Sequence, residues 1–200
     1  MKNRIQKISA HGMVVLLFSL LVSIAGGSIF EDAPNEVRGY LTSVGLRPDA
    51  WSKSSFMGWT AHDEGIPVWS GDSHSFLEYF LNGESQDRVT YAVVGLHYSP
   101  VFEDHEREAL SSFYQASKGL LMKAFPEEAE VIIQSFSWEK RTQVLVLGDA
   151  LIKLEYLNGN PRTPTYGFRF VIIHRDWAPN VFPDMEGLVA ADHPPLGRTK

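Results

Sequence analysis

Residues 88–98 read RVTYAVVGLHY and carry the clearest strand signal in the chain. β-Branched and aromatic side chains dominate this stretch, as they do in β-strands. Apolar residues occupy both sets of alternate positions, Val89, Tyr91 and Val93 on one face and Ala92, Val94 and Leu96 on the other. Because both faces are apolar, we expect a central strand that is covered on both sides of its sheet.

The longest predicted helix comes after this strand, over residues 104–124. Leu110, Phe113 and Leu121 recur with helical spacing. Acidic residues crowd its start and lysines lie near its end, as the helix dipole favours. Pro126 then suits the first turn of a further helix, although residues 132–138 could also alternate as a strand.

The last third of the chain predicts antiparallel strands. Residues 142–147 and 151–157 flank Gly148-Asp149, a strong signal for a two-residue hairpin. Lys153 and Glu155 are expected to face solvent in the second of these strands. A third strand is expected over residues 166–175, with Phe168 and Phe170 facing inward. Arg169 is expected on the opposite face, where it could pair with Glu155.

The segment upstream of the central strand predicts two helices and a short strand. Apolar side chains between Val37 and Val44 have helical spacing, and Gly45 suits the left-handed position that ends a helix. A short strand is expected over residues 56–60. A second helix is expected from Ser75, because Ser75 and Glu78 form a capping box and Asn82-Gly83 would end it.

These elements predict one α+β domain over residues 31–178. We expect a mostly antiparallel sheet of about four to five strands with three to four packed helices. Residues 179–200 contain four prolines and predict an extended tail.

Residues 1–30 predict a signal peptide or an N-terminal membrane anchor, formed by an apolar helix. Lys2, Arg4 and Lys7 precede a stretch, residues 12–30, that contains no charged residue, and acidic residues come directly after it. Positive charge before an apolar run and negative charge after it favour export of the chain beyond the run. The domain would then face the periplasm, either anchored in the inner membrane by residues 13–30 or released after cleavage.

The composition excludes several classes of partner and cofactor. From Ser28 onward there are 15 basic and 24 acidic residues, and such an acidic surface repels nucleic acid and anionic lipid. The chain has no cysteine, which excludes disulfides, thiolate nucleophiles and Cys-ligated metals. No phosphate-binding loop, serine-hydrolase elbow, zinc-protease helix or calcium loop is present.

Two sets of residues are candidates for a functional site. Aromatic rings beside carboxylates and imidazoles are typical of a groove that binds a saccharide or a peptide, and they occur together at Trp59, His62, Asp63, Trp69 and His74. Equally, Trp59 and Trp69 could be buried in the core, and the charged residues could be solvated side chains of loops.

The second set lies at two strand ends, His97 with Asp104 and His105, and His174 with Asp176. If the two strands ran parallel, these groups would meet and could hold zinc or manganese for a metal-assisted hydrolysis. The alternative is that both histidines are ordinary strand-terminal residues.

The leading functional hypothesis is an exported bacterial envelope protein that binds a ligand or partner, such as another envelope protein, a saccharide or a peptide, without catalysis. It predicts no cofactor and no contact with nucleic acid, and membrane contact through the N-terminal segment only. The metal-assisted hydrolase is the alternative.

Overall fold

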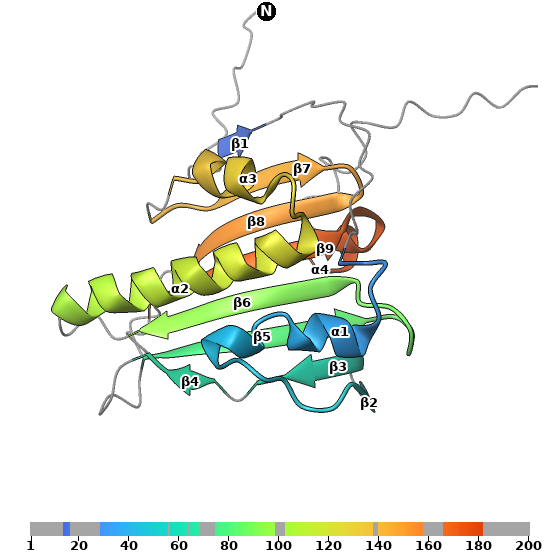
Figure 1. Ribbon diagram of the computed structural model, residues 1–200. Coiled ribbons are helices and arrows are strands. Elements are labelled where there is room, and N and C mark those ends of the chain that lie inside the picture. The colour runs from blue at the N-terminus through green and yellow to red at the C-terminus, as the bar shows by residue number, and fades with distance from the viewer. Residues whose placement is uncertain are drawn as a thin grey trace, which may run out of the picture.

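The computed structural model describes the greater part of the chain between Ile29 and Val181, together with a three-residue segment near the N-terminus. The described residues are 14–16, 29–55, 57–63, 65–68, 75–98, 103–137, 140–157 and 166–181. They form an α+β arrangement, in which helices cover one face of a large sheet (Figure 1).

Nine strands in the described residues form a single sheet. They are β1 (Val14–Leu16), β2 (Ser52–Ser54), β3 (Gly58–His62), β4 (Ile66–Pro67), β5 (Phe76–Gly83), β6 (Tyr91–Tyr98), β7 (Gln143–Leu147), β8 (Ala150–Leu157) and β9 (Tyr166–His174). The order is β1-β7-β8-β9-β6-β5-β3-β2, with β4 also paired to β5. All pairings are antiparallel except that of β1 with β7.

The main helices lie on one face of this sheet (Figure 1). They are α1 (Pro34–Gly39), α2 (Glu103–Ala124) and α3 (Ala129–Ser135), with a 3₁₀ turn at Thr42–Val44 after α1. The main core lies between the helices and the sheet, where Phe113 of α2 contacts Phe168 of β9 at 5.9 Å between ring centroids. This layer buries one set of alternate side chains from each central strand.

The opposite face of the sheet, which we call the open face, carries a smaller apolar cluster. Val93, Val144, Leu151, Val171 and Ile173 pack there. A 3₁₀ turn at Arg175–Trp177 and the short helix α4 (Ala178–Val181) add Trp177, Ala178 and Val181 to this cluster. Toward β5 and β6, beyond this cluster, the side chains of the open face become polar and partly exposed.

Several sequence predictions are confirmed. The strand at residues 88–98 is β6, which lies inside the sheet between β5 and β9. The hairpin at Gly148-Asp149 joins β7 to β8, and Gly148 adopts the positive φ of 54° that the turn requires. The predicted first helix is divided into α1 and the 3₁₀ turn at Thr42–Val44. The turn ends at Gly45 with φ of 90°, where the Leu46 N–H donates back to the Leu41 carbonyl at 3.2 Å.

The predicted helix from Ser75 is wrong. Residues 76–83 form β5, in which Leu77, Tyr79 and Leu81 are buried against the helices while Phe76, Glu78 and Phe80 point to the open face. The capping-box pattern is therefore coincidental. Alternation of aromatic and branched residues, together with pairing on both sides of the strand, determines the structure.

Three finer expectations also need correction. The described residues form nine strands instead of the expected four to five, because β1, β2, β4 and β5 were not predicted as strands. The second face of β6 is only partly covered, since Tyr91 and His97 retain exposure there. Lys153 is buried instead of wet, with 8% of its surface exposed.

The predicted ends of the chain fall mostly outside the described residues. Within residues 1–28 only Val14–Leu16 is described, and it forms the edge strand β1. Ile29 and Phe30 are buried in the main core, two residues before the predicted start of the domain. Residues 179–181 complete α4, and the rest of the predicted tail lies outside the described residues. Across the described segments, we find no helix with the length and apolar character that crossing a bilayer requires.

Candidate functional site

A row of side chains crosses the open face where four strands are paired in register. Glu78 of β5 lies opposite Gly95 of β6, Gly95 lies opposite Arg169 of β9, and Arg169 lies opposite Glu155 of β8. Residues in register on one face of neighbouring strands are direct neighbours. The row therefore begins with the acidic Glu78 and continues through Gly95, which has no side chain and leaves a gap. It ends with the basic Arg169 and the acidic Glu155.

Gly95 is the gap in this row, and Glu78 uses the space. A Cβ atom at Gly95 would lie 2.4 Å from Oε1 and 2.6 Å from Cγ of Glu78. The Glu78 side chain therefore lies over the backbone of β6. A glycine inside a strand often marks such a close approach.

Two imidazoles contact the Glu78 carboxylate. Nε2 of His97 lies 3.2 Å from Oε1, and Nε2 of His62 lies 3.6 Å from Oε2. The His97 ring is itself held by stacking on Phe76, with centroids 4.7 Å apart. Strands β3, β5 and β6 thus each supply one member of a His–Glu–His group, which fixes the position of the carboxylate.

The pKa of Glu78 is lowered below its ordinary value of 4.5. The hydrogen bond from His97 is the main cause, and burial of the carboxylate opposes it. Glu78 therefore remains an anion at neutral pH although only 20% of its side chain is exposed.

Arg169 lies across the gap from Glu78 with an available guanidinium group. Its register neighbour Glu155 accepts from Lys153, whose Nζ lies 2.8 Å from Oε1. Among the residues that the structure describes, no carboxylate lies within ion-pair distance of Arg169. The sequence-based expectation that Arg169 faces away from Phe168 and Phe170 is confirmed, but the ion-pair partner of Glu155 is Lys153.

Phe80, Tyr91 and Val93 form the apolar side of this region. The Phe80 ring lies edge-on to the Tyr91 ring at 6.0 Å and to the His62 ring at 6.0 Å. Burial raises the pKa of Tyr91 to about 12, opposed by the nearby Arg169 charge. The Tyr91 hydroxyl is therefore neutral at physiological pH and can donate a hydrogen bond.

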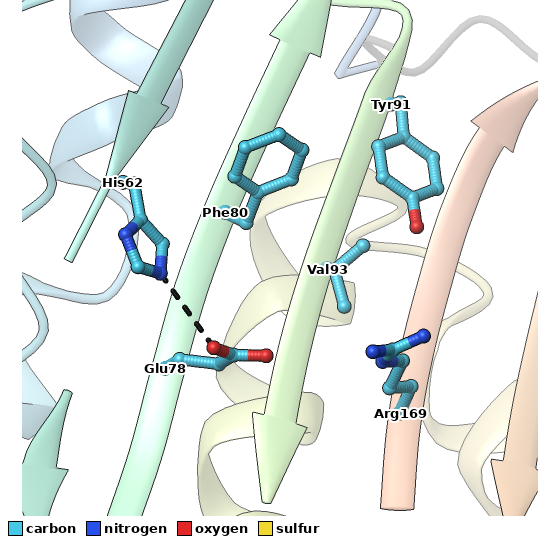
Figure 2. Close-up of a pocket in the computed structure, with 6 residues that line it drawn as sticks. All are labelled: His62, Glu78, Phe80, Tyr91, Val93 and Arg169. Carbon is cyan, nitrogen blue, oxygen red and sulfur yellow. Dashed lines mark ion pairs between the residues drawn. The ribbon is translucent and has the colours of Figure 1, made fainter. Parts of the chain in front are cut away.

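These groups together line a shallow pocket of about 250 Å³ on the open face. Six residues line it: His62, Glu78, Phe80, Tyr91, Val93 and Arg169. Figure 2 shows Glu78 and Arg169 on either side of β6, with the Tyr91 hydroxyl pointing toward the Arg169 side. Aromatic walls with a few charged groups at fixed positions are typical of a small-molecule site.

Only one member of the predicted ligand groove lines this pocket, and it is His62. Trp59 lies three residues before His62 in β3 and so points to the other face, where it stacks on Trp51 at 6.4 Å. The Asp63 carboxylate accepts from the backbone N–H groups of Arg47 and Gly65 and so holds a loop in place. Trp69 and His74 lie outside the described residues.

The predicted metal-binding residues do not meet. That prediction required parallel strands, but β6 and β9 run antiparallel, with His97 opposite Gly167 and the neighbour of His174 opposite Tyr91. His97 and His174 therefore lie at opposite ends of the strand pair. Nδ1 of His174 accepts from the backbone N–H of Asp176, which is an ordinary cap of the following turn.

The helix residues of that set, Asp104 and His105, begin α2, and their side chains lie outside the described part. Within the described segments, no three His, Asp or Glu side chains are arranged to hold a metal ion. In the group around Glu78, the imidazole nitrogens point at the carboxylate oxygens, which is the geometry of a hydrogen-bonded cluster.

Sequence reasoning missed Glu78, Phe80, Tyr91, Val93 and Arg169 as members of one site. Assigning residues 75–83 to a helix hid the first two. A usable signal was present, because Glu78 is an isolated acid in a run of aromatic and aliphatic residues. In a strand, that pattern places a charge on an otherwise apolar face.

Neither a protein-family model, nor a curated protein, nor a solved structure shows significant similarity to this chain. The residues of the pocket are therefore the basis on which a function can be proposed.

Proposed function

We propose that this chain is an exported envelope protein whose domain binds a small ligand, without catalysis, in the pocket on the open face. The observation that carries the proposal is the pocket of about 250 Å³ in which Glu78 and Arg169 face each other across Gly95, beside an aromatic wall. Fixed, opposite charges next to apolar rings provide orientation and affinity for a small molecule.

A binding role fits the chemistry of these groups better than a catalytic one. The Glu78 carboxylate is engaged by two imidazoles and remains ionised, so its role is that of a fixed negative charge. Among the described residues that line the pocket there is no serine, threonine or cysteine, the side chains that most often act as nucleophiles beside a histidine base.

Export is proposed from the charge pattern of residues 1–30. Export has a consequence for the edge of the sheet. Val14–Leu16 cannot pair with β7 while it lies in a membrane or after it has been cleaved from the domain. In the exported protein, β7 would be an edge strand, and Ile29 and Phe30 would be the first core residues. Protease accessibility of the domain in intact spheroplasts measures this directly, and a protected domain would contradict export.

Ligand binding can be tested by filling the pocket. Val93→Phe adds a ring to the pocket wall, and Val131→Phe adds the same ring on the exposed side of α3, where Val131 is 64% exposed. We expect at least one class among amino acids, short peptides, saccharides and carboxylic acids to raise the melting temperature of the wild type and of Val131→Phe. Val93→Phe should lose that response. A ligand that stabilises all three proteins equally, or no stabilising class at all, would contradict the proposal.

A further inference from the structure

Two acidic and two basic side chains lie in and beside the pocket. Glu78 and Glu155 carry negative charge, and Arg169 and Lys153 carry positive charge, so the immediate surroundings are neutral overall. Lys153 and Glu155 already form an ion pair. The two charges that remain for a ligand are the anion of Glu78 on one side and the cation of Arg169 on the other.

The spacing of these two charges is set by the sheet. Glu78 and Arg169 lie two strands apart, because Gly95 of β6 stands between them in register. Two strand spacings place their backbones about 10 Å apart. Among the described residues the two groups form no ion pair with each other. A ligand bound between the Glu78 carboxylate and the Arg169 guanidinium can therefore interact with both.

The hydrogen-bonding positions that Glu78 and Arg169 can still offer define the chemical groups that they can bind. A carboxylate has about four acceptor positions, so Glu78 can accept from a ligand in addition to His97 and His62. Arg169 presents a planar set of donors that fits a carboxylate with two parallel hydrogen bonds. The Tyr91 ring lies edge-on to the Phe80 ring and forms part of the apolar wall.

The dimensions favour a small molecule that carries both charges close together. Ammonium and carboxylate groups on one carbon atom are about 2.5 Å apart. With a charge-assisted hydrogen bond of about 2.8 Å on each side, such a ligand spans roughly 8 Å. Because the Glu78 side chain already lies over Gly95, its carboxylate is nearer to Arg169 than the roughly 10 Å between the two backbones, so the charges of the ligand must lie close together. A pocket of about 250 Å³ is below the range of drug-sized sites.

We propose that the pocket binds a small zwitterion, an apolar α-amino acid, with its ammonium group at Glu78, its carboxylate at Arg169 and its side chain against Phe80, Tyr91 and Val93. This inference rests on the proposed function and specifies its ligand class. A simple anion is disfavoured because it would meet Glu78, and a simple cation because it would meet Arg169.

The test titrates the full-length protein with L-leucine and with two compounds that each lack one charge. 4-Methylpentanoate lacks the ammonium group, and 3-methylbutylamine lacks the carboxylate. Binding is followed by isothermal calorimetry and by the total tryptophan fluorescence, to which Trp177 contributes with its ring 6.1 Å from that of Tyr91. We expect L-leucine to bind at least tenfold more tightly than either of the other compounds.

Variants that remove one charge then show which protein side chain binds the ammonium group and which binds the carboxylate of the ligand. Arg169→Gln should weaken binding of L-leucine and 4-methylpentanoate at least tenfold and should not weaken binding of 3-methylbutylamine, which loses a repelling charge. Glu78→Gln should weaken L-leucine and 3-methylbutylamine and should not weaken 4-methylpentanoate. Lys53→Gln and Glu84→Gln change the same charges at exposed positions away from the pocket and should behave as the wild type. Far-ultraviolet circular dichroism confirms that each variant is folded.

The outcomes separate this inference from the proposed function. Equal binding of L-leucine and 4-methylpentanoate, or indifference of L-leucine to Glu78→Gln, would overturn the zwitterion and leave a ligand pocket. The same holds if L-leucine does not bind while another class stabilises the wild type but not Val93→Phe. Failure of every compound class would overturn both.

Discussion

Gly95→Ala should destabilise the protein only while Glu78 is present. The three atoms nearest to a Cβ at position 95 all belong to Glu78, at 2.4, 2.6 and 2.9 Å. Real Cβ atoms do not approach other atoms so closely, so the Glu78 side chain must move. The Glu78 carboxylate would then lose its contact with His97, whose Nε2 lies 3.2 Å from Oε1 of Glu78.

The magnitude follows from two opposed effects. Losing a hydrogen bond to a charged group costs about 1.5–3 kcal/mol. Replacing glycine by alanine inside a strand contributes about 0.5–1 kcal/mol in the opposite direction. We therefore expect Gly95→Ala to lower the free energy of unfolding by about 1–2 kcal/mol in the wild type. In a Glu78→Ala background it should be neutral or slightly stabilising.

Urea unfolding of the wild type, both single variants and the double variant measures the coupling between the two positions. Gly167→Ala is the matched control, because its Cβ would meet the Leu96 carbonyl oxygen at 2.5 Å, and a backbone atom cannot turn away. Its cost should not depend on Glu78. If Gly95→Ala costs the same with and without the Glu78 side chain, the account of Gly95 as the gap in the row is wrong.

Two further predictions concern the charges of the pocket. Because the pKa of Glu78 is lowered in the folded state, its contribution to stability is complete above its ordinary pKa of 4.5 and is lost as the pH falls below that value. The difference in unfolding free energy between wild type and Glu78→Gln should therefore shrink between about pH 6 and about pH 3 in urea titrations, and a constant difference would show that Glu78 is not held as an anion. Lys153→Met should release Glu155 to its register neighbour Arg169, so L-leucine binding should weaken severalfold in calorimetry. Stability should be largely maintained, because Arg169 replaces Lys153 as the ion-pair partner of Glu155 and leaves no unpaired carboxylate. Unchanged binding in that variant would show that Lys153 does not keep Glu155 away from the pocket.

The elements predicted correctly from the sequence are those in which the local residue pattern and the tertiary packing favour the same structure. Residues 91–98 alternate as a strand and are paired on both sides, and Gly148 supplies the φ of 54° that its hairpin needs. Residues 75–83 contain conflicting signals, a helix cap and stop around a strand-forming centre. Pairing with β3, β4 and β6 decided that conflict, and pairing between distant strands cannot be derived from a local pattern.

The site was beyond prediction for a related reason. His62, Glu78 and Arg169 come from three strands widely separated in sequence, and only the sheet order brings them together. The metal-site hypothesis depended on the relative direction of β6 and β9, which hydrophobic patterns leave open. His62 was among the candidates chosen from the sequence and lines the pocket, but its partners there are defined by register and not by neighbours in the chain.

The most direct test of the central claim is a map of where a small zwitterion binds. Backbone amide chemical shifts of the isotopically labelled full-length protein are followed by NMR during titration with L-leucine. We expect the largest shift changes around Glu78, Val93, Gly95 and Arg169, on the three adjacent strands that line the pocket. Shift changes confined to the helical face, or to the Trp51–Trp59 edge of the sheet, would contradict this expectation.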